Sequence, residues 1–245
     1  MITHILFDLD GTLRHSKPTA LDLYHEYLVE QNVIAPDHDM RPAIRWAHSY
    51  WTGSDGPSGR DKERFGSSTE AFWLNYATQC LLAFGCTPKD AETHAPTINK
   101  IIEANYGKAE HFIPDDVFPT LQTLKDQGYP LAILTNRSYV AHDLIDELGL
   151  SPYMEFTLFA GEVEIWKPDP VIFAHALKKF GAAPENTLYV GDNYQADIVG
   201  ARRAGLHPVI IDPNEIFPEA DCPVIHAIAE VPTLLANGAY TPSQP

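Results

Sequence analysis

The chain has 245 residues, 44% of them hydrophobic and 20% charged, a composition typical of a soluble globular protein that can bury a core without disulfides. A formal net charge of −16 opposes binding to nucleic acid or to an anionic membrane surface, so we expect neither as a partner. The three cysteines form no C-x-x-C pair, and neither a basic leader nor a long apolar run is found, which favours a reducing, cytoplasmic location.

The first polar motif follows directly on a short apolar run. Residues 2–7 have the pattern of a buried parallel strand, and the motif D-x-D-G-T begins at Asp8. Because side chains alternate along a strand, Asp8 and Asp10 are expected to face the same way. Two adjacent carboxylates repel each other and usually need a cation, a shared proton or both. Gly11 lets the backbone turn sharply, and the Thr12 hydroxyl can lock that turn.

The next hundred residues or so are expected to be helical, without a strand. Apolar residues recur at helical spacing, and Thr87 followed by Pro88 is typical of a helix start. The predicted helices span residues 17–32, 41–51, 69–84 and 88–106. Residues 53–59 are so rich in glycine, serine and proline that we expect a loop there.

The pattern changes after residue 113, where short apolar strands alternate with helices. Strands are predicted at residues 130–134, 155–159, 187–190 and 208–211, and helices at 114–127, 139–148, 170–180 and 195–204. Such alternation is the sequence signature of a doubly wound parallel α/β sheet, to which the first strand also belongs. We therefore expect a Rossmann-like core of residues 1–14 and 113–245, with residues 15–112 inserted as a helical domain.

Polar residues stand at or shortly after the carboxyl ends of four predicted strands. They are Asp8 and Asp10, Thr135 and Asn136, Lys167, and Asp192 with Asp197. Taken singly, each has an ordinary interpretation as a turn, a helix cap or a surface lysine. Ligands of open parallel sheets bind at the carboxyl edge, so these residues are expected to converge on one crevice. Their convergence favours a functional site more strongly than any one motif.

In this order the motifs resemble those of the haloacid dehalogenase-like hydrolase superfamily, in its phosphatase branch. The matching elements are D-x-D-G-T at Asp8, T-N at Thr135, K-P at Lys167 and G-D-x-x-x-x-D at Gly191. The resemblance covers essentially the whole chain and implies that the helical insertion is a cap domain. The core matches well, whereas the cap matches in position and helical character.

The residue types also indicate a reaction, hydrolysis of a phosphomonoester through an aspartyl phosphate. Asp8 is the expected nucleophile, and Asp10 is expected to give a proton to the leaving group and to take one from water. A dianionic phosphate approaches these carboxylates only if charge is neutralised, which implies a hard divalent cation, Mg²⁺. The resemblance implies that its protein ligands are the carboxylates of Asp8 and Asp192 and the main-chain carbonyl of Asp10.

The remaining motif residues are expected to bind phosphate or to support the site. Lys167, the third catalytic residue, supplies positive charge to the phosphoryl oxygens and to the nucleophile. Thr135 and Asn136, with neighbouring backbone N–H groups, are expected to bind those oxygens. Thr12 and Asp197 are supporting residues, and Asp197 is expected to orient Lys167 or a metal-bound water rather than bind the metal.

The predicted function is therefore that of a Mg²⁺-dependent phosphatase acting on a small phosphorylated metabolite, as a monomer or homodimer. Sugar phosphates, phosphoglycolate-like acids and nucleoside monophosphates are all open as substrates. Family members that cleave carbon–halogen bonds typically lack the second aspartate, so Asp10 disfavours a dehalogenase. A phosphosugar mutase of the same family is the alternative, and a silent binding or regulatory protein is a less favoured one.

Positive charge gathers around the predicted loop in the helical insertion. The residues concerned are Arg41, Arg45, Arg60, Lys62 and Arg64, with His48 and Trp51 nearby. They either recognise an anionic or hydroxylated metabolite or form a solvated face. Arg14 and His15 either reach the crevice or line the hinge. Three tryptophans are expected in the core of the insertion rather than as stacking platforms, namely Trp46, Trp51 and Trp73.

Overall fold

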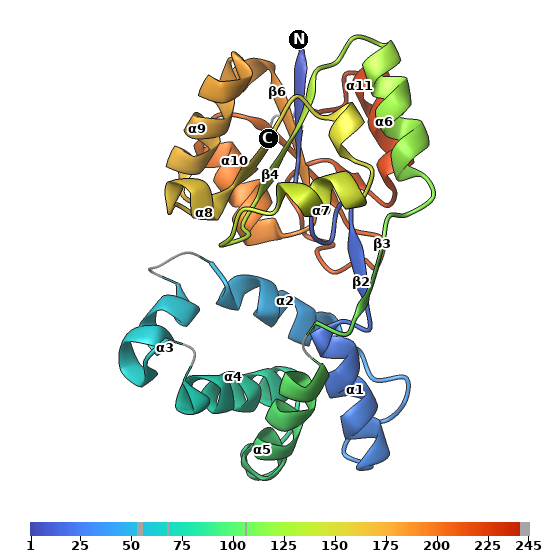
Figure 1. Cartoon of the computed structure of the whole chain (residues 1–245). Coiled ribbons are helices and arrows are strands. Elements are labelled where there is room, and N and C mark those ends of the chain that lie inside the picture. The colour runs from blue at the N-terminus through green and yellow to red at the C-terminus, as the bar shows by residue number, and fades with distance from the viewer. Residues whose placement is uncertain (53–55, 68, 106, 241–245) are drawn as a thin grey trace. The chain divides into compact units, whose positions relative to one another are not determined.

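The computed structural model of the protein describes residues 1–52, 56–67, 69–105 and 107–240 (Figure 1). The chain divides into two compact units, one made of Met1–His15 and Phe112–Pro245 and the other of Ser16–His111. We name them the core unit and the helical unit. Each boundary lies one residue away from the boundary predicted for the insertion. Among the described residues, no helix combines the length and hydropathy that a membrane span needs.

A six-stranded parallel sheet forms the centre of the core unit, which confirms the predicted doubly wound α/β fold. Its strand order is β5-β4-β1-β6-β7-β8. The strands are β1 (His4–Phe7), β4 (Leu131–Thr135), β5 (Thr157–Phe159), β6 (Thr187–Gly191), β7 (His207–Ile211) and β8 (Val224–Ile225). Phe7 of β1 is paired with Ile133 on one side and with Val190 on the other. The carboxyl ends of β1, β4 and β6 are therefore adjacent.

Helices cover both faces of this sheet, as Figure 1 shows for α6 and α11 on one side and α9 and α10 on the other. The helices are α6 (Val117–Asp126), α7 (His142–Glu147), α8 (Ala160–Val163), α9 (Pro170–Phe180), α10 (Gly200–Arg203) and α11 (Val231–Ala236). Ile5 and Phe7 pack into the cluster that includes α6, whereas Leu6 packs into the cluster that includes α9. Because both faces are buried, β1 is apolar at every position after its first residue, as the sequence indicates.

The helix predicted at residues 195–204 differs in form. Tyr194–Val199 is a π-helical turn, η3, and α10 follows it directly. The Asn193 side chain accepts hydrogen bonds from the backbone N–H groups of Gln195 and Ala196 and so begins the turn. Such wide turns often occur at functional sites, and this one carries the predicted residue Asp197.

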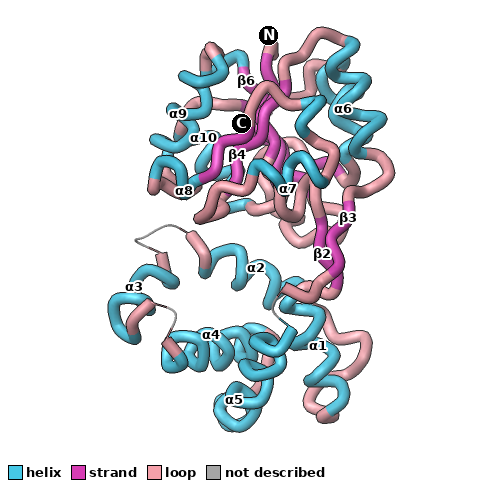
Figure 2. The backbone as a smooth tube through the Cα atoms, viewed as in Figure 1, coloured by secondary structure: helices cyan, strands magenta, loops and turns pink. Residues whose placement is uncertain are grey.

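The helical unit is composed mainly of helices (Figure 2). They are α1 (Ala20–Glu30), α2 (Arg41–Tyr50), α3 (Pro57–Phe65), α4 (Glu70–Ala83) and α5 (Pro88–Asn105). Thr19 caps α1 by accepting a hydrogen bond from the Asp22 N–H, and Thr69 caps α4 in the same way. The unit has its own apolar core, to which Leu28, Leu81 and Ile98 belong.

The structure corrects the sequence analysis in the helical insertion. The loop predicted at residues 53–59 is wrong for residues 57–59, where α3 begins. Pro57 suits the first position of a helix, because that position needs no N–H donor. Residues 53–55 lie outside the described part of the chain. The segment also has strands, since β2 (His15–Lys17) pairs with β3 (Glu110–Phe112). Neither of these short strands has a fully buried residue, and they are far apart in the sequence, so their pairing leaves no hydrophobic pattern to detect.

The tryptophan prediction is also wrong in part. Trp46 packs against the apolar core of the helical unit, but Trp51 and Trp73 are 38% and 37% exposed. Both exposed rings contact the Tyr76 ring, at centroid distances of 5.3 and 6.0 Å. They therefore belong to an aromatic surface cluster rather than to the core.

Candidate active site

Asp8 stands at the carboxyl edge of the sheet, immediately after β1. Its N–H donates to the Val190 carbonyl at 2.9 Å, so the backbone is still held by β6. Its residue exposure is only 7%, which makes it a nearly buried carboxylate. An ionised carboxylate in such a place needs a positively charged partner.

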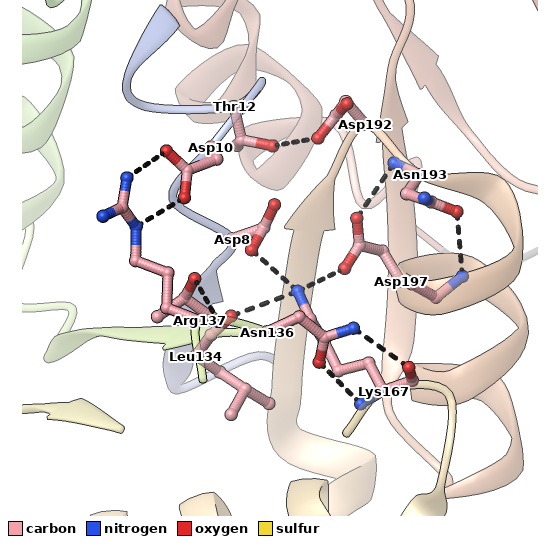
Figure 3. A network of polar contacts seen from close by, with 12 residues as sticks. Asp8, Asp10, Thr12, Leu134, Asn136, Arg137, Lys167, Asp192, Asn193 and Asp197 are labelled. Carbon is pink, nitrogen blue, oxygen red and sulfur yellow. Dashed lines mark hydrogen bonds and ion pairs between the residues drawn. The ribbon is translucent and has the colours of Figure 1, made fainter. Parts of the chain in front are cut away.

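That partner is Lys167, whose ammonium lies at the centre of the site (Figure 3). Lys167 is 1% exposed, and its Nζ lies 2.7 Å from an oxygen of Asp8 and 2.7 Å from an oxygen of Asp197. The same Nζ contacts the Tyr189 hydroxyl at 2.8 Å and the Leu134 carbonyl at 3.2 Å. A single buried ammonium thus joins residues of, or just after, β1, β4 and β6.

The loop that carries Lys167 is fixed by Asn136. The Asn136 Oδ1 accepts from the Lys167 backbone N–H at 2.7 Å, and its Nδ2 donates to the Lys167 carbonyl at 3.0 Å. The side chain of Asn136 is therefore directed at this backbone. Thr135, 2% exposed, ends β4 beside it. The two residues predicted to bind phosphate thus adjoin Lys167 and the end of β4, and their contact with phosphate stays a prediction.

Asp197 is fully buried, and both of its oxygens have partners. Oδ1 accepts from Lys167 and from the Tyr189 hydroxyl at 3.0 Å, and Oδ2 accepts from the Asn193 N–H at 2.9 Å. A Cβ at Gly191 would lie 2.4 Å from this carboxylate, so only glycine fits there. The contacts of Asp197 are those of a residue that orients Lys167. Tyr189 is missing from the predicted site because a tyrosine in an apolar strand indicates core packing.

Three carboxylates gather where a cation could bind. One ligand oxygen from each of Asp8, Asp192 and Asp197 lies within 4.8 Å of the others. Burial raises the pKa of Asp8 to about 7 despite the opposing charge of Lys167, and burial with the nearby Asp8 and Asp197 raises the pKa of Asp192 well above its ordinary value. These carboxylates resist ionising together without a cation. Hard oxygen ligands in this number fit Mg²⁺.

Asp10 lies on the opposite side of Asp8 from the Lys167 ammonium (Figure 3), and two guanidinium groups bind its carboxylate. Arg137 donates from Nε to Oδ2 at 2.7 Å and from Nη2 to Oδ1 at 2.8 Å, and Arg14 donates from Nη1 to Oδ1. Burial alone would raise the pKa of Asp10, but the hydrogen bonds and charges of Arg137 and Arg14 outweigh it and hold the pKa below its ordinary value.

The turn after β1 brings Arg14 to Asp10. The Arg14 N–H donates to the Leu9 carbonyl at 2.9 Å, and the Gly11 N–H donates to the Arg14 carbonyl at 2.8 Å. Of the two residues with an open role after the first motif, Arg14 therefore reaches the site, whereas the His15 ring stacks on Phe112 at 5.7 Å.

Thr12 and Gly11 also position Asp192. The Thr12 hydroxyl donates to an oxygen of Asp192 at 3.1 Å, and its supporting role stays a prediction. Gly11 has φ of +91°, and a Cβ there would lie 2.4 Å from the Asp192 carboxylate. The turn is therefore compatible with this carboxylate only because residue 11 has no side chain.

Two of the positively charged side chains of the helical unit contact nearby side chains of the same unit. The Arg41 guanidinium donates to Asp39 at 2.8 and 2.9 Å. The Lys62 ammonium lies 5.9 Å from the centroid of the Trp51 ring. These contacts favour the interpretation of the two residues as a solvated face rather than a recognition site.

The comparisons with known proteins agree on the superfamily to which the chain is similar. Residues 2–205 match the family described as haloacid dehalogenase-like hydrolase. The chain is 32% identical over 227 residues to a phosphoserine phosphatase of Thermus thermophilus, covering 85% of this chain and 88% of that protein. It is 28% identical to a ribulose-1,5-bisphosphate 5-phosphatase of Halopiger xanaduensis, over 88% of this chain and 87% of the relative. A 2-haloacid dehalogenase from Pseudomonas syringae is similar in structure, with a TM-score of 0.55 and 26% identity over 98% of this chain and 100% of its own.

A first prediction concerns the close approach of Gly11 to Asp192. Gly11→Ala should displace the Asp192 carboxylate and weaken Mg²⁺ binding by about tenfold or more, in addition to a strain of roughly 1–2 kcal/mol from the positive φ. The matched control is Gly128→Ala, because Gly128 has φ of +86° and a Cβ added there would meet no atom of the described chain within 4 Å. Calorimetric titration with Mg²⁺ measures the difference, and equal affinity in the two variants would contradict the prediction.

A second prediction concerns pH. The pKa of Asp8 is higher in the folded chain than its ordinary value of 3.8, so the folded state holds this proton to higher pH than the unfolded state does. Without metal, the Asp8 contribution to the free energy of unfolding should therefore fall as pH rises from about 4 to about 7. Urea unfolding in chelator at about pH 5 and pH 8 should show a weaker pH dependence for Asp8→Asn than for the wild type. Equal dependence in both would refute this assignment.

Proposed function

Because the chain belongs to the haloacid dehalogenase-like hydrolase family, we propose that it is a Mg²⁺-dependent phosphatase that hydrolyses a small phosphomonoester through an aspartyl phosphate on Asp8. The observation that carries the proposal is the buried Asp8 carboxylate, 2.7 Å from the Lys167 ammonium and next to a second carboxylate two residues later. Nucleophile, phosphate-binding charge and acid–base group are thereby close together.

The reaction follows from these side chains in two displacements at phosphorus. In the first, a carboxylate oxygen of Asp8 bonds to phosphorus, the ester P–O bond breaks, and the leaving oxygen takes a proton from the Asp10 carboxyl, which holds that proton once its contacts with Arg14 and Arg137 are loosened. In the second, water attacks phosphorus, gives a proton to Asp10, and releases phosphate and the Asp8 carboxylate. Lys167 offsets the negative charge of the phosphoryl oxygens in both steps.

Charge explains why a metal ion is proposed. Asp8, Asp192 and Asp197 outnumber the ammonium of Lys167, and a phosphate dianion would add to the excess of negative charge. Mg²⁺ bound by the carboxylates of Asp8 and Asp192 and by the main-chain carbonyl of Asp10 would neutralise that excess. Asp197 is a less suitable ligand, since both of its oxygens already accept hydrogen bonds.

Alternative activities have less support. Dehalogenation needs no proton donor for the leaving halide, whereas this chain has Asp10 beside the nucleophile. The phosphatase names of the relatives do not favour a phosphosugar mutase. A silent binding protein would have no need of the Asp8–Lys167–Asp197 network, and metal-dependent turnover would exclude it.

Several features stay predictions of the same proposal. The helical unit is proposed as the cap that excludes water and contacts the part of the substrate beyond the phosphate. The monomeric or homodimeric state, the cytoplasmic location and the identity of the small phosphorylated metabolite are likewise predicted from the sequence.

Turnover of phosphate esters tests the proposal directly. Release of phosphate from p-nitrophenyl phosphate and from a panel of metabolite phosphates should require Mg²⁺ and stop in chelator. Asp8→Asn should lower kcat by about 1,000-fold or more, because the amide cannot replace the carboxylate nucleophile. The control is Asp143→Asn, an exposed aspartate on α7, which should retain wild-type activity. Inert wild-type protein on every ester, with Mg²⁺ present, would overturn the proposal.

A further inference from the structure

Arg14 and Arg137 stand out among the charged residues of the core unit because both guanidinium groups contact one carboxylate. We propose that they bind a second anionic group of the substrate, a carboxylate or a second phosphate, next to the phosphoryl site at Asp8. The inference rests on the proposed function and specifies its substrate class, a phosphomonoester that carries a further negative charge.

The local charge balance is the first argument. Arg137 binds both oxygens of Asp10, at 2.7 and 2.8 Å, and Arg14 binds one of the same oxygens. The three side chains together carry one net positive charge, in a chain whose formal net charge is −16. Two guanidinium groups at one carboxylate favour the approach of another anion.

The unsatisfied donor of Arg14 is the second argument. Its side chain is only 6% exposed, and among the described residues its Nε has no hydrogen-bond partner. A buried N–H without a partner costs free energy, since it has lost water and gained nothing in exchange. The hydrogen-bonding capacity of Arg14 is therefore not exhausted by Asp10.

The proposed role of Asp10 is the third argument. To give a proton to the leaving oxygen, the Asp10 carboxyl must turn toward the substrate, and it cannot then keep all its bonds to both guanidinium groups. Arg14 and Arg137, whose side chains are 6% and 14% exposed, would lose their common partner with little access to water. A second oxyanion on the substrate would replace it. The planar fork of arginine matches both carboxylate and phosphate.

The position of Arg137 suits this role. It follows β4 by two residues, and its Nη1 donates to the Tyr139 hydroxyl at 2.8 Å, which holds the guanidinium at the carboxyl edge of the sheet. In Figure 3 the Asp8 carboxylate lies between the Arg137 guanidinium and the Lys167 ammonium. A phosphoryl group on Asp8 would then have Lys167 on one side, with the remainder of the substrate directed past Asp10 toward Arg137.

Matched substrate pairs that differ by one charge test the inference. Suitable pairs are phosphoglycolate with its carboxamide, phosphoserine with its carboxamide, and a sugar bisphosphate with the corresponding monophosphate. In the wild type with Mg²⁺, the anionic member of at least one pair should have a kcat/KM about tenfold higher or more. In Arg137→Gln this ratio should fall toward one. Arg137→Lys should restore only part of it, because lysine keeps the charge but lacks the fork.

The control is Arg202→Gln. Arg202 forms a similar pair with Asp221, at 2.7 Å, but both side chains are well exposed, so the charge preference should stay at the wild-type value. Arg14→Gln should also lower the ratio. If burial of Arg14 makes that variant unstable, Arg137→Gln decides alone.

The outcomes separate this inference from the proposed function. If p-nitrophenyl phosphate and all pairs are inert in the wild type, the phosphatase proposal itself fails. If esters are hydrolysed but no pair shows a charge preference, or if the preference persists undiminished in Arg137→Gln, the second-anion site is wrong and phosphatase activity stands. Loss of the preference in Arg137→Gln, with the Arg202→Gln control unchanged, supports the site.

Discussion

The sharing of one buried ammonium between two carboxylates is the constraint on which the site depends. Lys167 and Asp197 have almost no exposure to water, and Asp8 has little, so none of the three charges is stable without the others. Removing one partner from such a buried pair typically costs about 3–5 kcal/mol, because an uncompensated charge remains. Burial alone would lower the pKa of Lys167, yet the charges of Asp197 and Asp8 raise it above its ordinary value. The amine of Lys167 therefore stays protonated.

This constraint extends to the backbone. Asp8 follows β1, Lys167 lies on a loop bound by the Asn136 side chain after β4, and Asp197 lies on η3 after β6. The carboxylates of Asp8 and Asp197 must both lie within hydrogen-bond distance of the Lys167 Nζ. A register shift in any of the three neighbouring strands would therefore break the network. The parallel pairing of β1 with both β4 and β6 supplies that register.

The two sides of Asp8 carry different kinds of positive charge, and the difference has a chemical consequence. Lys167 is a compact charge enclosed by acceptors, suited to a phosphoryl group whose oxygens change position during reaction. Arg14 and Arg137 are planar groups fixed on a carboxylate, suited to an oxyanion that stays in place. Under the proposed function, part of the substrate specificity would then reside in the core unit, in addition to any contribution from the helical unit.

Local patterns in the sequence determined the strands, their alternation with helices, and the positions of Asp8, Lys167, Asp192 and Asp197 at one edge of the sheet, because apolar periodicity and strand ends are properties of neighbouring residues. These patterns were enough to predict the fold class and most of the residues that the structure brings together at the candidate site. Tertiary structure alone decided that Arg137 binds Asp10, that Tyr189 joins the Lys167 network, and that β2 pairs with β3. Each of these depends on contact between segments distant along the chain, which leaves no periodic trace in the sequence. Charge and hydropathy specify which residues can pair, but only the folded backbone specifies which of them meet.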